Sequence, residues 1–109
     1  MSCRIGDILL IKFPFTNLSK AKKRPVLVIK SENEFGDFVC LQITSKSTAD
    51  NLLKIEIENF KNDVLKLESY LKYDKCFTLN CEMVDKKLVE VNEEFIKKIR
   101  ELFCDEIFV

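Results

Sequence analysis

The sequence predicts a mostly β domain of the α+β class, a small and strongly curved antiparallel barrel with one C-terminal α-helix. Most apolar residues occur in short runs rich in β-branched and aromatic side chains, or alternate with charged residues, and both patterns are typical of strands. Only the C-terminal stretch repeats apolar residues at helical spacing. A chain of 109 residues is expected to form one domain, residues 1–109, with a buried core.

The first two strands are predicted on either side of a polar loop. Residues 8–13 form a nearly continuous apolar run after a Gly-Asp turn signal. A second apolar run, residues 26–29, follows Pro25, which stands at the start of a strand where its missing N–H does least harm. Residues 16–23 are the polar loop between them.

The middle of the chain predicts three more segments. Residues 38–43 form a strand after a hairpin-type connection that contains Gly36, and the polar residues 44–51 form a turn or a short helix. Apolar and charged residues alternate over 53–57, which indicates a half-exposed strand. Residues 65–79 alternate again and predict one long, bent strand or two short ones.

The chain ends in a weaker strand, residues 83–91, followed by the helix. Asn92 can cap this helix, and Glu93 and Glu94 suit its first turn. The apolar stripe consists of Phe95, Ile96, Ile99, Leu102 and Phe103. This stripe could complete the core or form a dimer contact, and the pattern favours the core.

Positive charge is concentrated near the N-terminus. Residues 1–31 carry seven basic side chains and one acidic one, a net charge of +6, although the whole chain has a net charge of zero. The densest basic run, residues 20–24, immediately precedes the second strand. This asymmetry indicates either a surface that binds a polyanion or a solvated loop that happens to be basic.

Five cysteines and the absence of histidine restrict the chemistry of the chain. The odd count and the lack of a CxxC pair predict reduced, mostly buried thiols instead of a zinc site. Catalytic triads that contain histidine are excluded, so catalysis would depend on Arg, Lys, carboxylates or hydroxyls. No metal or cofactor is expected. Without a signal peptide or an apolar run of about 20 residues, we expect a cytoplasmic protein with no membrane association.

Four stretches occur in a characteristic order, namely GDILLIKFPFTN, KRPVLVIKS, LQITSKS and SYLKYDKCFTL. Together they resemble the MazF/PemK family, the endoribonuclease toxins of type II toxin–antitoxin systems, over residues 5 to about 103. The resemblance implies an SH3-like barrel, a homodimer, and a cognate antitoxin with which the toxin binds DNA. It also implies sequence-specific, metal-independent cleavage of single-stranded RNA, mainly mRNA, which inhibits translation and growth until the antitoxin neutralises the toxin.

The resemblance also implies site residues. Arg24 matches the catalytic arginine of the Arg-Pro motif, and Thr44 matches the catalytic threonine of the Ile-Thr-Ser motif. Asp74 lies where several members place an acidic residue proposed as a general base. The residues implied in RNA binding are Thr16, Lys20, Lys22, Lys23, Ser45, Lys46 and Lys72. The loop over residues 16–23 lacks the glycines that the family often has there, which could stiffen it and alter sequence choice.

The chemistry of these residue types suits RNA cleavage. The 2′-oxygen of RNA can attack the adjacent phosphorus, which leaves a 2′,3′-cyclic phosphate and a 5′-hydroxyl. A guanidinium offers phosphate a planar fork of donors, and its very high pKa makes Arg24 a better charge stabiliser than base. A hydroxyl at Thr44 can donate to a phosphate oxygen, and Asp74 is the best base candidate in a chain without histidine.

Each assignment has an alternative. Arg24 could pair with an acid at the barrel rim, and Thr44 could be an ordinary turn hydroxyl. Asp74 could be a structural hydrogen-bond acceptor, and Lys72 could be a solvated strand residue. Two other functions also stay open for the whole chain: a gyrase-poisoning toxin of the CcdB kind, and a non-catalytic module that binds RNA or an antitoxin.

Overall fold

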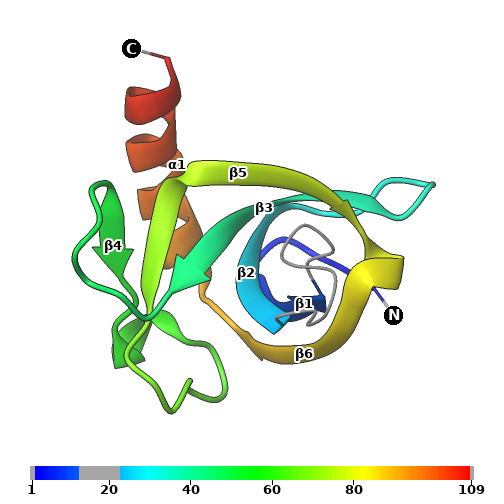
Figure 1. Ribbon diagram of the computed structural model, residues 1–109, viewed down its shortest axis with the longest axis horizontal. Helices are drawn as coiled ribbons and strands as arrows, with labels where there is room; N and C mark the ends of the chain where they lie inside the picture. The colour runs from blue at the N-terminus through cyan, green and yellow to red at the C-terminus, as the bar shows by residue number, and fades with distance from the viewer. Residues whose placement is uncertain (1, 13–22, 109) are drawn as a thin grey trace, which may run out of the picture.

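The computed structural model describes residues 2–12 and 23–108. The strands are β1 (Asp7–Lys12), β2 (Lys23–Lys30), β3 (Asp37–Thr44), β4 (Leu52–Lys54), β5 (Tyr70–Asn80) and β6 (Val84–Glu90). The helices are two short 3₁₀ turns, η1 (Ile57–Asn59) and η2 (Cys81–Met83), and the C-terminal α1 (Glu93–Ile107) (Figure 1). No helix in these two described ranges is both long enough and apolar enough to cross a bilayer.

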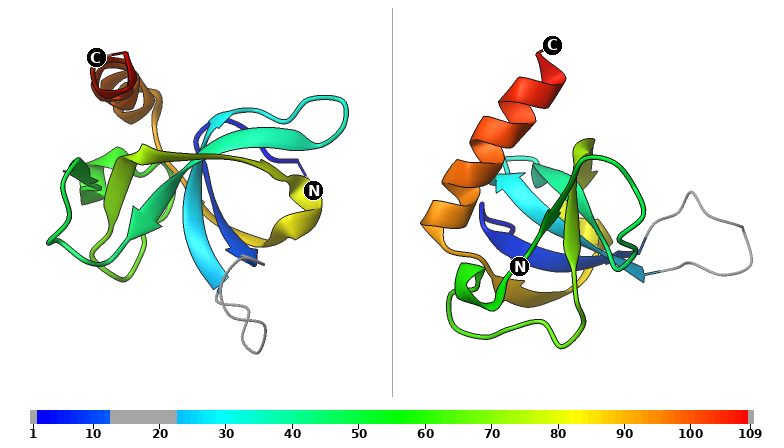
Figure 2. Two further views of the ribbon diagram at one scale, coloured as in Figure 1. Left: turned by 45° about the horizontal axis from the view of Figure 1, so that its top comes forward. Right: turned by 90° about the vertical axis from the view of Figure 1, so that its left-hand side faces the viewer.

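The six strands form one antiparallel sheet in the order β4-β5-β3-β2-β1-β6. The sheet is strongly curled, and within the described ranges β4 and β6 remain its two edges, so the curl does not close into a complete barrel. The predicted combination of a curved antiparallel sheet and one terminal helix is confirmed. Figure 2 shows α1 at one side of the sheet, with its C-terminal end projecting beyond the strands.

Alternation along the strands divides the core between the two faces of the sheet. Leu27, Leu41 and Leu71 point to one face, where they pack with Phe95 and Ile99 of α1. The opposite face, inside the curl, carries a second apolar cluster, whose buried members are Cys3, Leu9, Ile11, Val26, Val28, Phe38, Cys40 and Leu79. The helix stripe therefore contributes to the monomer's core, as its pattern favoured.

Asn92 caps α1 as the sequence predicts. Its side-chain oxygen accepts a hydrogen bond from the backbone N–H of Phe95 at 2.9 Å. Its side-chain amide donates to the carbonyl of Glu58 at 2.8 Å, which ties the start of the helix to η1. The cap therefore fixes the helix relative to the sheet as well as satisfying one of its free N–H groups.

The strand predicted over residues 65–79 is one bent strand, β5, but it starts only at Tyr70, and residues 65–69 form bends and irregular structure instead. The bend arises where the register between β3 and β5 shifts: Leu41 lies opposite Cys76, but its neighbour Gln42 lies opposite Lys72. Three residues of β5, numbers 73–75, have no partner on β3 at this bulge. Bulges of this kind bend a strand and redirect its side chains.

The strand predicted over residues 53–57 is wrong beyond Lys54. Ile57 begins η1 and is 77% exposed, whereas the alternation would have buried it. The backbone N–H of Glu56 donates to the side-chain oxygen of Asn59 at 2.8 Å, and this local bond favours a turn over a continued strand. The polar residues 44–51 form bends and irregular structure after the end of β3, which agrees with the predicted turn.

The prediction for the cysteines is also wrong in part. Cys3 and Cys81, which are 78 residues apart, form a disulfide. Cys40 is a buried free thiol, and burial, with a smaller contribution from Cys76, raises its pKa to about 12. Cys76 and Cys104 are exposed. The sequence offered no local spacing that could have predicted the Cys3–Cys81 pair.

Candidate functional site

An open cleft of about 510 Å³ lies where β2 begins and β3 ends. We call it the basic cleft, and its lining residues are Lys23, Arg24, Pro25, Gln42, Ile43, Thr44, Ser45, Lys46, Leu67 and Ser69. Five of the ten residues that the sequence implicates in catalysis or RNA binding lie in this set: Lys23, Arg24, Thr44, Ser45 and Lys46. Strand pairing thus brings the start of β2 and the end of β3 together.

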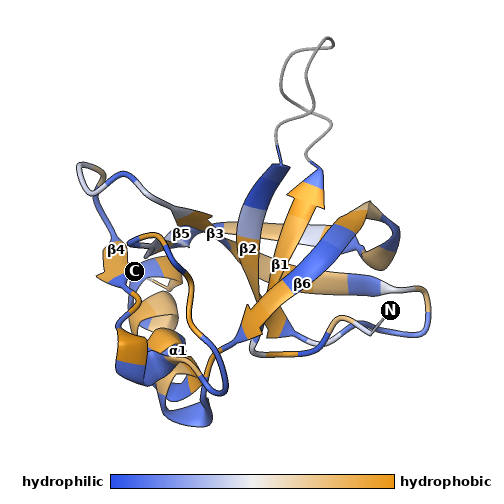
Figure 3. Ribbon diagram, turned by 90° about the horizontal axis from the view of Figure 1, so that it is seen from below, coloured by the Kyte–Doolittle hydropathy of each residue, from blue (hydrophilic) through white to orange (hydrophobic). Residues whose placement is uncertain are grey.

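The register of the sheet explains why Arg24 reaches the cleft. Arg24 lies opposite Ile11 on β1, and Ile11 is completely buried in the cluster inside the curl. Arg24 therefore shares the inner face but stands at its rim, half-buried, two residues before the buried Val26. In Figure 3, β2 is coloured hydrophilic at its start and hydrophobic farther along.

Thr44 comes to the same rim from the neighbouring strand. Val26 of β2 lies opposite Gln42 of β3, and continuing this register by two residues sets Arg24 beside Thr44. The Thr44 hydroxyl oxygen accepts a hydrogen bond from the backbone N–H of Lys46 at 3.1 Å. This local turn holds the hydroxyl in place and leaves its own proton available to donate.

The basic cleft is electropositive. Its lining contains three cationic side chains and no carboxylate. Lys23 pairs with Asp85 of β6 at 3.2 Å, but both side chains are partly exposed. Within residues 2–12 and 23–108, no carboxylate forms an ion pair with Arg24 or Lys46. The guanidinium of Arg24 therefore remains available for an anionic ligand, which disfavours its alternative role as a structural ion-pair partner.

Asp74 and Lys72 lie outside the lining of the basic cleft and form an ion pair with each other. The Nζ atom of Lys72 is 2.6 Å from Oδ1 of Asp74 and donates to the backbone carbonyl of Asp50 at 2.6 Å. Oδ2 of Asp74 accepts a hydrogen bond from the side-chain amide of Asn51 at 3.0 Å. The close contact with the Lys72 ammonium and, less strongly, the hydrogen bond from Asn51 lower the pKa of Asp74. This environment favours a structural acceptor, because a carboxylate with a lowered pKa is a weaker base.

A family model decides which proteins this chain is related to. The model, described as PemK-like, MazF-like toxin of type II toxin–antitoxin system, matches residues 4–106. The chain belongs to this toxin family. No curated protein sequence matches it.

Solved structures agree with this family at the level of the fold. A MazE–MazF structure from Deinococcus radiodurans has a TM-score of 0.77 and 14% identity, over 97% of this chain and 96% of that one. A mycobacterial endoribonuclease in complex with its cognate antitoxin has a TM-score of 0.73 and 16% identity, over 97% and 95%. The Mycobacterium tuberculosis toxin MazF-mt6 has a TM-score of 0.70 and 14% identity, over 94% and 97%.

Sequence reasoning about this MazF-like chain did not assign the other five lining residues to the site, namely Pro25, Gln42, Ile43, Leu67 and Ser69. Gln42 lies two residues before Thr44 on the same face of β3, so strand alternation could have identified it. Leu67, which is 76% exposed, and the buried Ser69 come from the segment before β5 and carry no local signal. Of the predicted RNA-binding residues, Thr16, Lys20 and Lys22 lie outside the described residues.

Acid titration can test the structural role of Asp74 in this toxin fold. A lowered pKa in the folded state adds stability above the unfolded value of about 3.9, and this stability is lost as the pH falls through the folded value. We therefore expect Asp74→Asn to make the free energy of unfolding less steeply dependent on pH below about pH 4. Urea unfolding at several acidic pH values measures this slope.

The matched control is Asp105→Asn, which removes an exposed acid from α1 and should keep the wild-type slope. If Asp74→Asn instead keeps that slope but abolishes RNA cleavage, Asp74 acts in catalysis and the structural assignment is wrong.

Proposed function

We propose that this chain is a sequence-specific endoribonuclease toxin that cleaves single-stranded RNA, above all mRNA, without a metal ion. Residues 1–109 would form the single toxin domain. Family membership supports the proposal, and so do the similar structures, which include a mycobacterial endoribonuclease and the Mycobacterium tuberculosis toxin MazF-mt6. The observation that carries it is the basic cleft, where Arg24, Lys46 and the Thr44 hydroxyl meet with no carboxylate among the lining residues.

In the proposed reaction, RNA supplies its own nucleophile. The 2′-hydroxyl loses its proton to solvent as its oxygen attacks the adjacent phosphorus. The bond to the 5′-oxygen breaks and this oxygen takes up a proton from solvent, so the products carry a 2′,3′-cyclic phosphate and a 5′-hydroxyl. Arg24 would bind the non-bridging oxygens as their negative charge grows, and Thr44 would donate its hydroxyl proton to one of them in a hydrogen bond. This step uses the 2′-oxygen of the RNA as its nucleophile and so needs no metal-bound water, and Arg24 and Thr44 would stabilise the charge that develops on the phosphate.

Cleavage assays test this mechanism directly. We expect purified protein to cut a long single-stranded RNA at the same rate with and without EDTA, because the cleft offers no carboxylate, cysteine or histidine to a metal. A substrate with 2′-deoxyribose at the cut site should resist, while deoxyribose at a distant position serves as the matched control. Efficient cutting at the deoxy position would contradict the mechanism, and RNA retention without cleavage would indicate a non-catalytic module.

Salt dependence tests whether the cleft binds phosphates. We expect Lys46→Gln to flatten the slope of log K against log salt by roughly 0.7, the value for one phosphate contact on a single strand. Lys98→Gln, an exposed lysine on α1, is the control and should leave the slope unchanged. Fluorescence anisotropy with a 2′-deoxy oligonucleotide measures binding without cleavage. An unchanged slope in Lys46→Gln would remove this residue from the RNA interface.

We also propose that the chain forms a homodimer and is neutralised by a cognate antitoxin. The structures of MazE–MazF and of a mycobacterial endoribonuclease with its cognate antitoxin support the proposal of an antitoxin partner. An acidic antitoxin segment could occupy the basic cleft and exclude RNA by competition, because both ligands are polyanions. Sedimentation at micromolar concentration measures the oligomeric state, and a monomer there would contradict the dimer.

A further inference from the structure

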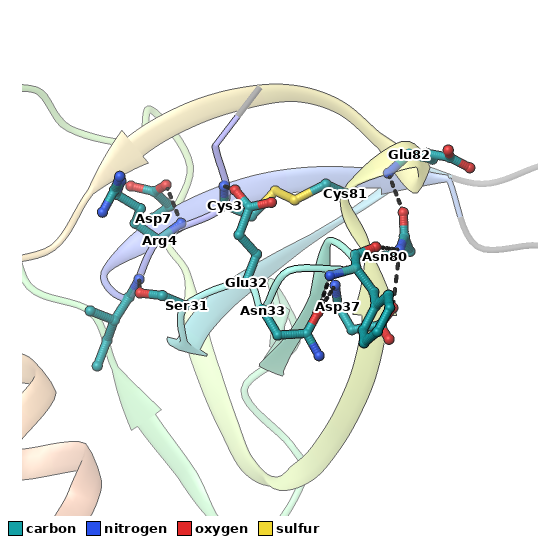
Figure 4. The surroundings of a disulfide bond; sticks show 12 residues. Cys3, Arg4, Asp7, Ser31, Glu32, Asn33, Asp37, Asn80, Cys81 and Glu82 are labelled. Atoms are coloured by element: carbon teal, nitrogen blue, oxygen red, sulfur yellow. Dashed lines mark hydrogen bonds between the residues drawn. A yellow bond between two sulfur atoms is a disulfide. The ribbon is translucent and has the colours of Figure 1, made fainter.

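A second cluster of reactive groups lies away from the basic cleft, around the disulfide (Figure 4). The sulfurs of Cys3 and Cys81 and a carboxylate oxygen of Glu32 all lie within 4.8 Å of one another. The sulfur of Cys3 is buried, and Cys81 and Glu32 are half-buried. None of the three lines the basic cleft. We infer that, when the two cysteines are reduced, Cys3, Cys81 and Glu32 bind Zn²⁺.

The types of these three ligands suit zinc. Thiolate sulfur is a soft ligand that favours Zn²⁺ over Mg²⁺ or Ca²⁺, and carboxylate oxygen completes many zinc sites. Four-coordinate zinc leaves one position after these three ligands, and water can fill it because the site is not fully enclosed.

Hydrogen bonds hold Cys3 and Glu32 together without help from the disulfide. The backbone N–H of Cys3 donates to Oε1 of Glu32 at 2.7 Å, and the N–H of Glu32 donates to the carbonyl of Cys3 at 2.9 Å. Beside this pair, the N–H of Ile5 donates to the Ser31 hydroxyl at 2.8 Å. The segment before β1 is therefore tied to the end of β2 whether or not the cysteines are bonded.

Cys81 is held on the other side by the turn between β2 and β3. Its backbone N–H donates to the carbonyl of Gly36 at 2.8 Å. The side-chain amide of Asn80 donates to the Phe35 carbonyl at 2.9 Å and to Oδ1 of Asp37 at 3.0 Å. A site whose supporting bonds already exist needs little rearrangement when its ligands are released from the disulfide.

The orientation of Glu32 also fits a ligand. The oxygen Oε1 is occupied by the N–H of Cys3, which fixes the carboxylate next to the sulfurs. Among the hydrogen bonds and ion pairs of the described residues, none involves Oε2 of Glu32, so this oxygen can bind the metal. A hydrogen bond to the non-ligating oxygen is a common way in which proteins orient a metal-binding carboxylate.

Conversion of the disulfide-bonded chain into the reduced, zinc-binding chain needs two electrons, which thiols can supply. Two thiol molecules reduce the Cys3–Cys81 bond: the S–S bond breaks, two electrons pass to the cysteine sulfurs, and the thiols join in a new disulfide. Their two protons pass first to Cys3 and Cys81 and are released to solvent when Zn²⁺ binds the thiolates. Zinc and the disulfide therefore exclude each other, and the site is available only to the reduced chain.

The test uses the full-length protein reduced with a phosphine and loaded with ZnCl₂, then freed of unbound metal by gel filtration. We expect one Zn²⁺ per chain in the wild-type protein and in the controls Cys76→Ser and Cys104→Ser, which remove exposed cysteines outside the cluster. Cys3→Ser and Cys81→Ser should bind none, and Glu32→Gln should weaken binding by at least ~10-fold. Circular dichroism checks that each variant is folded.

A second measurement does not depend on any variant. Co²⁺ added to the reduced wild-type chain should give the near-ultraviolet absorption of thiolate-to-cobalt charge transfer, and the disulfide-bonded chain should give none. The proposal is overturned if the reduced wild-type protein retains no zinc, if Cys3→Ser binds it with wild-type affinity, or if the disulfide-bonded protein binds it equally well.

Discussion

Replacing Arg24 by alanine is expected to slow RNA cleavage by about 10²–10³-fold while the chain stays folded. This is the usual cost of removing one preorganised donor from a developing negative charge. Arg24 stands half-buried at the rim of the basic cleft, and no carboxylate of the described residues pairs with it. Its removal should therefore leave no buried charge without a partner.

Arg24→Lys should recover little of the lost rate. A lysine keeps the positive charge but offers a single ammonium in place of the planar fork that can hold two phosphate oxygens at once. The comparison separates geometry from charge, because a site that needs only positive potential would accept lysine. Single-turnover cleavage of a defined RNA measures the chemical step of each variant.

Arg100→Ala is the matched control, because Arg100 is an exposed arginine of α1 that does not line the basic cleft. Its cleavage rate should stay near that of the wild-type protein. An Arg24→Ala variant that is folded by circular dichroism and cuts at the wild-type rate would exclude Arg24 from catalysis.

Residues of the basic cleft that lie on paired strands could be predicted from the sequence. Arg24 precedes the apolar run of β2 and Thr44 follows that of β3. Antiparallel pairing of two consecutive strands sets the start of the first beside the end of the second. The resemblance to the family then indicated which polar residues at that rim to consider. Local pattern and strand topology are enough for this part of the site.

The surroundings of Asp74 could not be predicted in this way. Sequence alternation places Lys72 and Asp74 on one face of β5, but the bulge over residues 73–75 redirects the strand. The bulge is stabilised from a distance, since the N–H of Tyr73 donates to the carbonyl of Asn51 at 3.2 Å. Asn51 itself adopts a positive φ of 57°, a conformation that asparagine tolerates better than most residues. Neither the bulge in β5 nor the positive φ of Asn51 produces a periodic pattern in the sequence.

Phe95→Ala is expected to lower the free energy of unfolding by about 3–5 kcal/mol, the range for truncating a buried aromatic residue. Phe95 is 1% exposed and packs between the sheet and α1, in the same cluster as Leu71 and Ile99. Its backbone N–H donates to the Asn92 cap in any case, so the substitution removes packing and not the cap. Urea unfolding followed by circular dichroism measures the loss.

Phe108→Ala is the control, because Phe108 is 82% exposed just after the same helix and should change stability by less than about 0.5 kcal/mol. A loss below about 1 kcal/mol in Phe95→Ala would mean that α1 is not docked on the sheet as described.

The milder variant Phe95→Leu separates stability from activity. Phe95 packs on the face of the sheet that carries Leu27 and Leu41, whereas Arg24 and Gln42 stand on the opposite face with Val26. Because successive residues of a strand point to opposite faces, a small cavity under α1 need not move the side chains of the basic cleft. We expect Phe95→Leu to unfold at lower urea concentration yet cleave RNA at the wild-type rate under conditions where it is folded. If the cleavage rate of the folded variant falls together with its urea midpoint, the helix-covered face of the sheet and the face with the basic cleft are coupled through the strands.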